Sequence, residues 1–239
     1  FGPARGPDGA LYVSLNLASS GAGIFKEIRG TWSEIGKATR EQLASGKTGG
    51  AGRMYGRVPY RGCIVRIADG GRGPAELFAT GFRSPDGIGF GPHGSILITD
   101  NQGEWLPANK LVEVRPGAFF QFRSRPPWHP FDRPEPTPPA VWLPQGEIAA
   151  SPTEPFLLPT GWGPYAGHVL FGDATYGGLQ RAFLEEVDGA LQGAVFHFSQ
   201  GFRHLFHRFA LTAEGELYAG GIARGRDAHV GWRVGRLRA

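Results

Sequence analysis

The chain has 239 residues and a net charge of +4, and its 39 glycines and 20 prolines accompany a hydrophobic fraction of 41%. That apolar content excludes a disordered chain, and the scattered charge, which forms no basic run, excludes a typical nucleic-acid-binding face. No stretch approaches 18 apolar residues, which excludes a membrane-spanning helix, and the single cysteine, Cys63, excludes an internal disulfide and a cysteine-based zinc site.

One sequence unit recurs along the chain: an apolar run, a tight turn that contains glycine, and a second run rich in β-branched or aromatic residues. Its four copies have turn glycines at Gly9, Gly94, Gly167 and Gly215, and the third copy is the weakest. Such a unit is typical of a β-hairpin, in which glycine supplies the backbone conformation with positive φ. The last two glycines lie 48 residues apart, which fits one propeller blade of about 40–50 residues.

Further strands are predicted between these hairpins, at 62–67, 75–79, 110–114, 119–122, 178–184, 192–198 and 232–238. The longer repeat intervals indicate insertions at about 18–58, with a possible helix at 32–43, and at about 116–148, where the proline-rich stretch 122–140 predicts a rigid surface loop. Two hairpins per period give a four-stranded blade. The sequence therefore predicts an all-β chain, one β-propeller domain over residues 1–239 with about four blades, which opens within a repeat at Phe1 and is incomplete at its N-terminus.

Residues that flank the inner hairpins should gather on one face of the ring, because the start of the first strand and the end of the second lie at the same end of an antiparallel hairpin. Such polar residues occur at Asn16, Arg83, Asp86, Asp100, Asn101, Asp173, Thr175, Arg203 and His204. Carboxylates, amides and arginines gathered in this way can hold a hard cation or an anionic ligand. The alternative is structural, since aspartate and asparagine at strand ends commonly cap turns.

The segments 81–90 (GFRSPDGIGF) and 99–103 (TDNQG) resemble the glucose/sorbosone dehydrogenase-like β-propellers, a quinoprotein-type group. The similarity is greatest to a subgroup of membrane-bound dehydrogenase-domain proteins that are often fused to cytochrome c modules, whose pattern continues at 58–62, 110–117, 172–173, 192–196 and 220–221. The resemblance implies a six-bladed ring, of which this chain would be a fragment. It also implies an exported protein, periplasmic or extracellular.

Characterised members of this group bind pyrroloquinoline quinone and calcium on one face of the ring and oxidise a sugar hydroxyl. The resemblance implies the same two cofactors here, a sugar or alcohol as substrate, and a cytochrome c domain as electron acceptor. It points to Arg83 as a catalytic residue and to Asp100, with Asn101, as calcium ligands. Their position on the shared face adds Asp86 as a catalytic residue, Asp173 as a metal ligand, and Asn16, Asn101, Thr175, Arg203 and His204 as cofactor-binding residues. The histidine base of the group has no counterpart at 83–86, the position just before an inner strand, and its place would lie upstream of Phe1.

The leading hypothesis is thus a quinoprotein-type dehydrogenase that oxidises a sugar or alcohol hydroxyl. One alternative is a non-catalytic propeller that binds carbohydrate or a partner protein through the same face. Another is a calcium-dependent, lactonase-like hydrolase, in which aspartate and asparagine would surround a metal-bound water. Binding of a quinone would separate the first hypothesis from the other two, because fold alone does not fix function.

Overall fold

Strands make up most of the structure, a computed structural model that describes residues 2–16, 62–102, 106–121, 135–201, 204–223 and 233–237. Within these ranges no helix is long and apolar enough to cross a membrane. The possible helix at 32–43 and most of the proline-rich stretch lie outside the described residues.

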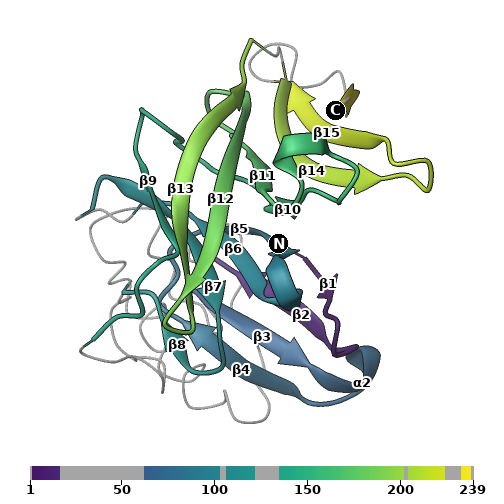
Figure 1. The fold of residues 1–239 in the computed structure, drawn as a ribbon. Helices are drawn as coiled ribbons and strands as arrows, with labels where there is room; N and C mark the ends of the chain where they lie inside the picture. The colour runs from purple at the N-terminus through teal and green to yellow at the C-terminus, as the bar shows by residue number, and fades with distance from the viewer. Residues whose placement is uncertain are drawn as a thin grey trace.

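The strands form four separate sheets that follow one another along the chain (Figure 1). The first contains β1 (Ala4–Arg5), β2 (Leu11–Leu15), β3 (Cys63–Ile67), β4 (Ala75–Thr80) and β8 (Ala118–Phe119). The second contains β5 (Pro85–Phe90), β6 (Ile96–Asp100), β7 (Ala108–Val114) and β9 (Val141–Pro144). The third contains β10 (Phe156–Leu157), β11 (Val169–Gly172), β12 (Leu179–Val187) and β13 (Ala190–Ser199), and the fourth contains β14 (His204–Leu211), β15 (Leu217–Ala223) and β16 (Arg233–Leu237).

Each sheet begins with a hairpin at one of the four repeats and continues through antiparallel strands, except that β8 joins the first sheet in parallel. In the third sheet the first strand, β10, lies earlier than the repeat predicted. The four turn glycines all have positive φ, at 78° for Gly9, 76° for Gly94, 79° for Gly167 and 81° for Gly215. A side chain at these positions would be strained, which is why the turns recur with glycine in the sequence. The β-propeller prediction is confirmed: the chain is an all-β series of blades. The strand expected at 119–122 is shorter, and β8 pairs in parallel with β4.

The hydrophobic core lies between successive blades. Side chains alternate along β6, so Ile96 and Ile98 pack in the cluster between the first and second blades, and Leu97 packs in the cluster between the second and third. A third cluster, around Leu170 and Phe206, joins the third and fourth blades. The strands β6 and β11 are therefore buried on both faces, whereas the outer strands β9 and β13 are partly exposed.

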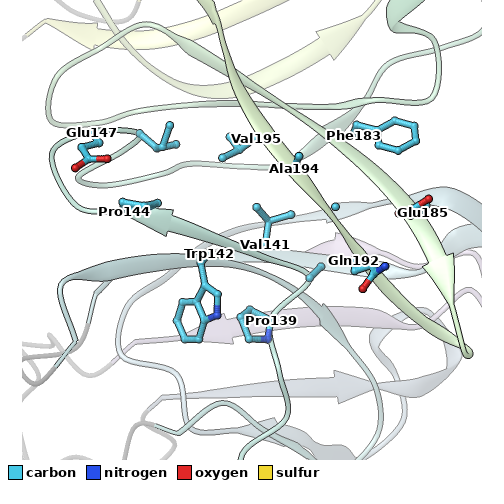
Figure 2. A pocket seen from close by; sticks show the side chains of 13 residues that line it. Pro139, Val141, Trp142, Pro144, Glu147, Phe183, Glu185, Gln192, Ala194 and Val195 are labelled. Atoms are coloured by element: carbon cyan, nitrogen blue, oxygen red, sulfur yellow. The ribbon is translucent and has the colours of Figure 1, made fainter.

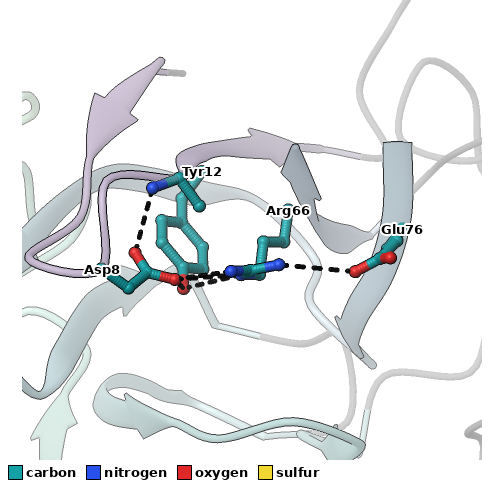
Figure 3. A network of polar contacts seen from close by, with 5 residues as sticks. Asp8, Tyr12, Arg66 and Glu76 are labelled. Carbon is teal, nitrogen blue, oxygen red and sulfur yellow. Dashed lines mark hydrogen bonds and ion pairs between the residues drawn. The ribbon is translucent and has the colours of Figure 1, made fainter. Parts of the chain in front are cut away.

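A network of polar contacts connects the turn between β1 and β2 to the neighbouring strands of the first blade (Figure 3). Arg66 of β3 contacts Asp8 at 2.8 Å and Glu76 of β4 at 3.5 Å, and the Tyr12 hydroxyl donates to Asp8 at 3.0 Å. The bond from Arg66 holds the pKa of the Asp8 carboxyl below its ordinary value. The side chains are partly exposed, so solvent screens each of these pairs. The network joins the turn of the first hairpin to β3 and β4.

Candidate functional site

Asp100 is the last residue of β6, and its carboxylate is completely buried. It accepts hydrogen bonds from the backbone N–H groups of Arg83, at 3.1 Å, and Ser84, at 2.8 Å, and it lies 3.2 Å from the Lys110 ammonium. Lys110 also donates to the Phe120 carbonyl at 3.0 Å. This buried ion pair ties the segment that carries Arg83 to the ends of β6 and β7. The structure thus shows a structural role for Asp100, and its role as a metal ligand stays a prediction.

Asp173 stands at the corresponding position after β11 and is equally buried. Its carboxylate accepts hydrogen bonds from four backbone N–H groups, those of Ala150, Ser151, Thr175 and Tyr176. Both aspartates are therefore surrounded by hydrogen-bond donors, as a turn-capping role requires. Across the described part of the chain, no group of three or more histidine, cysteine, aspartate or glutamate side chains is placed to hold a metal ion. Calcium binding by Asp173 likewise stays a prediction.

The ends of the second and third inner hairpins meet at Ser151. Its hydroxyl accepts a hydrogen bond from the Asn101 amide at 3.2 Å and one from the Thr175 hydroxyl at 2.9 Å. These two predicted cofactor-binding residues therefore share one face, at adjacent blades. The Asn101 Oδ1 and Gln102 Oε1 atoms are buried and have no hydrogen-bond partner among the described residues. Two amide acceptors are thus available there to a ligand that donates hydrogen bonds.

Arg83 lies directly before β5, with its backbone N–H bound to Asp100. Burial lowers the pKa of its guanidinium, and the Asp100 carboxylate opposes that effect. An arginine nevertheless keeps its charge at every physiological pH. The Nε atom is buried without a partner within the described ranges. Arg83 therefore offers a fixed positive charge with an unused donor on the same face as Asn101.

Asp86 lies in β5, three residues after Arg83, and only 7% of its surface is exposed. Burial raises the pKa of its carboxyl to about 6, against a smaller lowering by Arg208. Its Oδ1 atom has no hydrogen-bond partner in the described part of the structure. A carboxyl with such a pKa changes charge near neutrality, which is a property of groups that accept and release protons during catalysis.

The remaining predicted residues are placed less fully. Asn16 is half-buried just after β2. His204 opens β14 opposite Ala223, and only its backbone is described. Arg203 lies outside the described residues.

Sequence analysis missed Lys110, Ser151, Glu154 and Arg208, although all four contact predicted residues or their neighbours. Lys110 could have been predicted from the sequence, because it is a charged residue in an otherwise apolar part of a strand. It is buried and lies directly opposite Asp100. Ser151 could not have been predicted, since it lies in an irregular segment between β9 and β10 whose path depends on the packing of two blades.

The buried Asp86 carboxyl predicts a loss of stability as the pH rises from about 4 to about 7. Its pKa of about 6 in the folded protein lies above its ordinary value of 3.8. The protonated form therefore stabilises the fold below pH 4, and this stabilisation, about 3 kcal/mol, disappears as the pH rises through 6. Urea unfolding across this range should show a shallower pH dependence for Asp86→Asn than for the natural protein. Identical slopes would contradict the assignment.

A separate groove of about 880 Å³ lies between β9 and the β12–β13 hairpin (Figure 2). Its lining is mostly apolar, with Val141 and Val195 on facing strands and the carboxylates of Glu147 and Glu185 among the lining groups. The groove belongs to the outer strands of two blades, whereas the candidate site lies at the ends of the inner hairpins. The two features are therefore distinct.

Neither a protein-family model nor a curated protein matches the sequence. Solved structures do match its fold. They include a proposed oxidoreductase (glucose dehydrogenase) from Thermus thermophilus, with a TM-score of 0.61 and 17% identity over 96% of this chain. They also include a glucose dehydrogenase, with a TM-score of 0.60 and 15% identity over 98% of this chain.

A further match is the PQQ-bound form of an aldose sugar dehydrogenase from Streptomyces coelicolor, with a TM-score of 0.57 and 13% identity over 97% of this chain. The chain spans about three fifths of the length of these structures, from 59% to 62%. At such identities the likeness shows the fold alone, which is the fold of the sugar dehydrogenase β-propellers.

Proposed function

We propose that this chain forms part of a quinone-dependent dehydrogenase that oxidises a hydroxyl of a sugar or alcohol. The observation that carries the proposal is a set of buried polar atoms that have no partner among the described residues. They belong to Arg83 and Asp86, at the start of β5, and to Asn101 and Gln102, just after β6. Buried donors and acceptors are normally paired, and unpaired ones gathered at one place favour a ligand there. The fold is that of proteins whose solved forms include a PQQ-bound sugar dehydrogenase.

The residues on this face fit pyrroloquinoline quinone, a planar quinone with three carboxylates. Arg83 would hold a negatively charged part of it through the unpaired Nε, because a guanidinium binds oxygen anions well. The free Oδ1 of Asn101 would accept a hydrogen bond from the pyrrole N–H of the quinone, and Oε1 of Gln102 would accept one from a substrate hydroxyl. Thr175, which contacts Ser151 beside Asn101, would line the same site. Calcium would add charge at the same face, with Asp100 and Asp173 as the proposed ligands. When bound, the quinone supplies the two-electron acceptor of the reaction.

Two residues of the chain would then act on the substrate, one as proton acceptor and one by stabilising charge. Asp86, ionised above pH 6, accepts the proton of the substrate hydroxyl at a carboxylate oxygen. Arg83 would stabilise the negative charge that the acceptor gains when the hydrogen leaves the sugar carbon as hydride, because a positioned cation acts more strongly in a water-poor site than in bulk water. The wider proposal places the protein outside the cytoplasm, with a cytochrome c domain as electron acceptor.

A measurement of dehydrogenase activity tests this proposal. The natural protein that carries this sequence, supplied with calcium and pyrroloquinoline quinone, should reduce an artificial electron acceptor when an aldose or alcohol is added. Asp86→Asn should lose most of this activity, because general-base catalysis contributes about 10²–10⁴-fold. Glu214→Gln, at the exposed turn of the fourth hairpin, is the matched control and should remain fully active. Absence of acceptor reduction with every aldose and alcohol would overturn the proposal, and binding of a glycan instead would favour the non-catalytic alternative.

A further inference from the structure

The inner strands of three blades meet at Gly87, the residue after Asp86. Gly87 has a φ of +90°, and a Cβ atom on it would lie 2.6 Å from the Cα of Glu154 and 3.0 Å from Nη1 of Arg208. Glu154 lies two residues before the inner strand of the third blade, and Arg208 belongs to that of the fourth. Because glycine has no side chain, the backbone of one neighbouring blade and the guanidinium of the other come directly against β5.

Hydrogen bonds hold Glu154 and Arg208 in this position. The Oε2 atom of Glu154 accepts from the backbone N–H of Phe209 at 3.3 Å and lies 3.9 Å from Nε of Arg208. Nη1 of Arg208 donates to the carbonyl of His207 at 3.1 Å. Glu154 is therefore held by the fourth blade, and Arg208 is held by its own strand and by Glu154.

Three charged residues interact electrostatically here, and we call them the Asp86 charge cluster: Asp86, Glu154 and Arg208. Burial raises the pKa of Glu154, Arg208 lowers it and Asp86 raises it again. Burial likewise raises the pKa of Asp86, while Arg208 lowers it. The nearby His207 has its pKa lowered by burial and by Arg208, so it is neutral at neutral pH. The charges that face Asp86 at neutral pH are thus mainly one anion and one cation, from two different blades.

We propose that Glu154 and Arg208 are positioning residues that set the protonation state of Asp86 with opposite effects. The geometry supports this, because Asp86 is more than nine-tenths buried, has an unpartnered oxygen within the described residues, and adjoins the glycine against which both groups pack. The inference rests on the proposed function only in treating Asp86 as the proton acceptor. The balance between the two charges would keep Asp86 ionised at neutral pH and still able to take up a proton.

Direct titration of Asp86 tests the proposal without any cofactor or substrate. In protein with ¹³C-labelled aspartate, the Asp86 carboxyl resonance, assigned by its absence from Asp86→Asn, gives the titration midpoint. Arg208→Met should raise the midpoint by about one pH unit, a tenfold change in proton affinity, and Glu154→Gln should lower it by a similar amount, since an adjacent charge typically has an effect of this size. Glu185→Gln, which removes an exposed carboxylate from β12, should leave it unchanged.

Opposite shifts in the two variants cannot come from a general loosening of the fold, which would move both midpoints in the same direction. Arg208→Lys keeps the charge and should keep the natural midpoint, and Glu154→Gln alone carries the test if Arg208→Met fails to fold. In the two variants that remove a charge, the midpoint must move. Midpoints that do not move, or that move in the same direction, would overturn the proposal. This test and the test of the proposed function can fail separately. Opposite shifts in a protein without dehydrogenase activity would confirm that Glu154 and Arg208 act on Asp86, and would show that Asp86 has no catalytic role.

Discussion

Asp100→Ala is expected to lower the free energy of unfolding by about 3–5 kcal/mol. The substitution leaves the Lys110 ammonium, whose side chain is 5% exposed, in the interior without its anion. It also removes the acceptor of the Arg83 and Ser84 N–H groups. Guanidinium-induced unfolding of both proteins at neutral pH gives the difference.

Two controls separate the buried charge from other effects of this substitution. Asp8→Ala removes a carboxylate from the partly exposed network of the first blade and should cost about 1 kcal/mol or less. The double variant Asp100→Ala, Lys110→Met removes both charges and should be more stable than Asp100→Ala alone, because no uncompensated ion remains. A loss below about 1 kcal/mol in Asp100→Ala would show that the ion pair does not support this end of the hairpin.

Arg83→Ala should reduce turnover by about 10²–10³-fold, the largest effect expected on catalysis outside the proton acceptor. Its guanidinium is placed to stabilise charge that develops in the transition state, so kcat should fall more than KM rises. Arg83→Lys should recover only part of the rate, since an ammonium lacks the planar set of donors. The backbone N–H of Arg83 still binds Asp100 in both variants, so the fold should persist.

Arg115→Ala is the matched control, because Arg115 is an exposed arginine that contacts Glu113 on the same blade. It should leave kcat unchanged. If Arg83→Ala keeps the natural kcat and KM, Arg83 is not a catalytic residue. Steady-state rates with saturating cofactor distinguish these results from a simple loss of cofactor.

The repeat pattern predicted most of this fold because its physical causes are local. A turn that requires positive φ selects glycine, and strands buried on both faces select apolar residues, so both leave a readable pattern at each hairpin. The strand β9 was missed, since Val141–Pro144 is short, ends in proline and lies within the range expected to be an insertion. Its pairing with β7, like that of β8 with β4, depends on tertiary packing.

The candidate site was predictable in position but not in detail. Hairpin geometry indicated that the ends of β6 and β11 share a face, and the contacts of Asn101 and Thr175 with Ser151 show that they do. The sequence could not tell a carboxylate that binds backbone N–H groups, as Asp100 and Asp173 do, from one open to a ligand. Nor could it indicate Glu154 and Arg208, because their approach to Asp86 depends on the packing of three blades at Gly87.

Calorimetric titration of the natural protein with pyrroloquinoline quinone in the presence of calcium tests the central claim most directly. The account predicts saturable binding at a single site, weakened in Arg83→Ala and unchanged in Arg115→Ala. It also predicts that binding requires calcium, and that calcium alone binds more weakly than the two together. Absence of quinone binding at any calcium concentration would contradict the assignment of this face as a cofactor site.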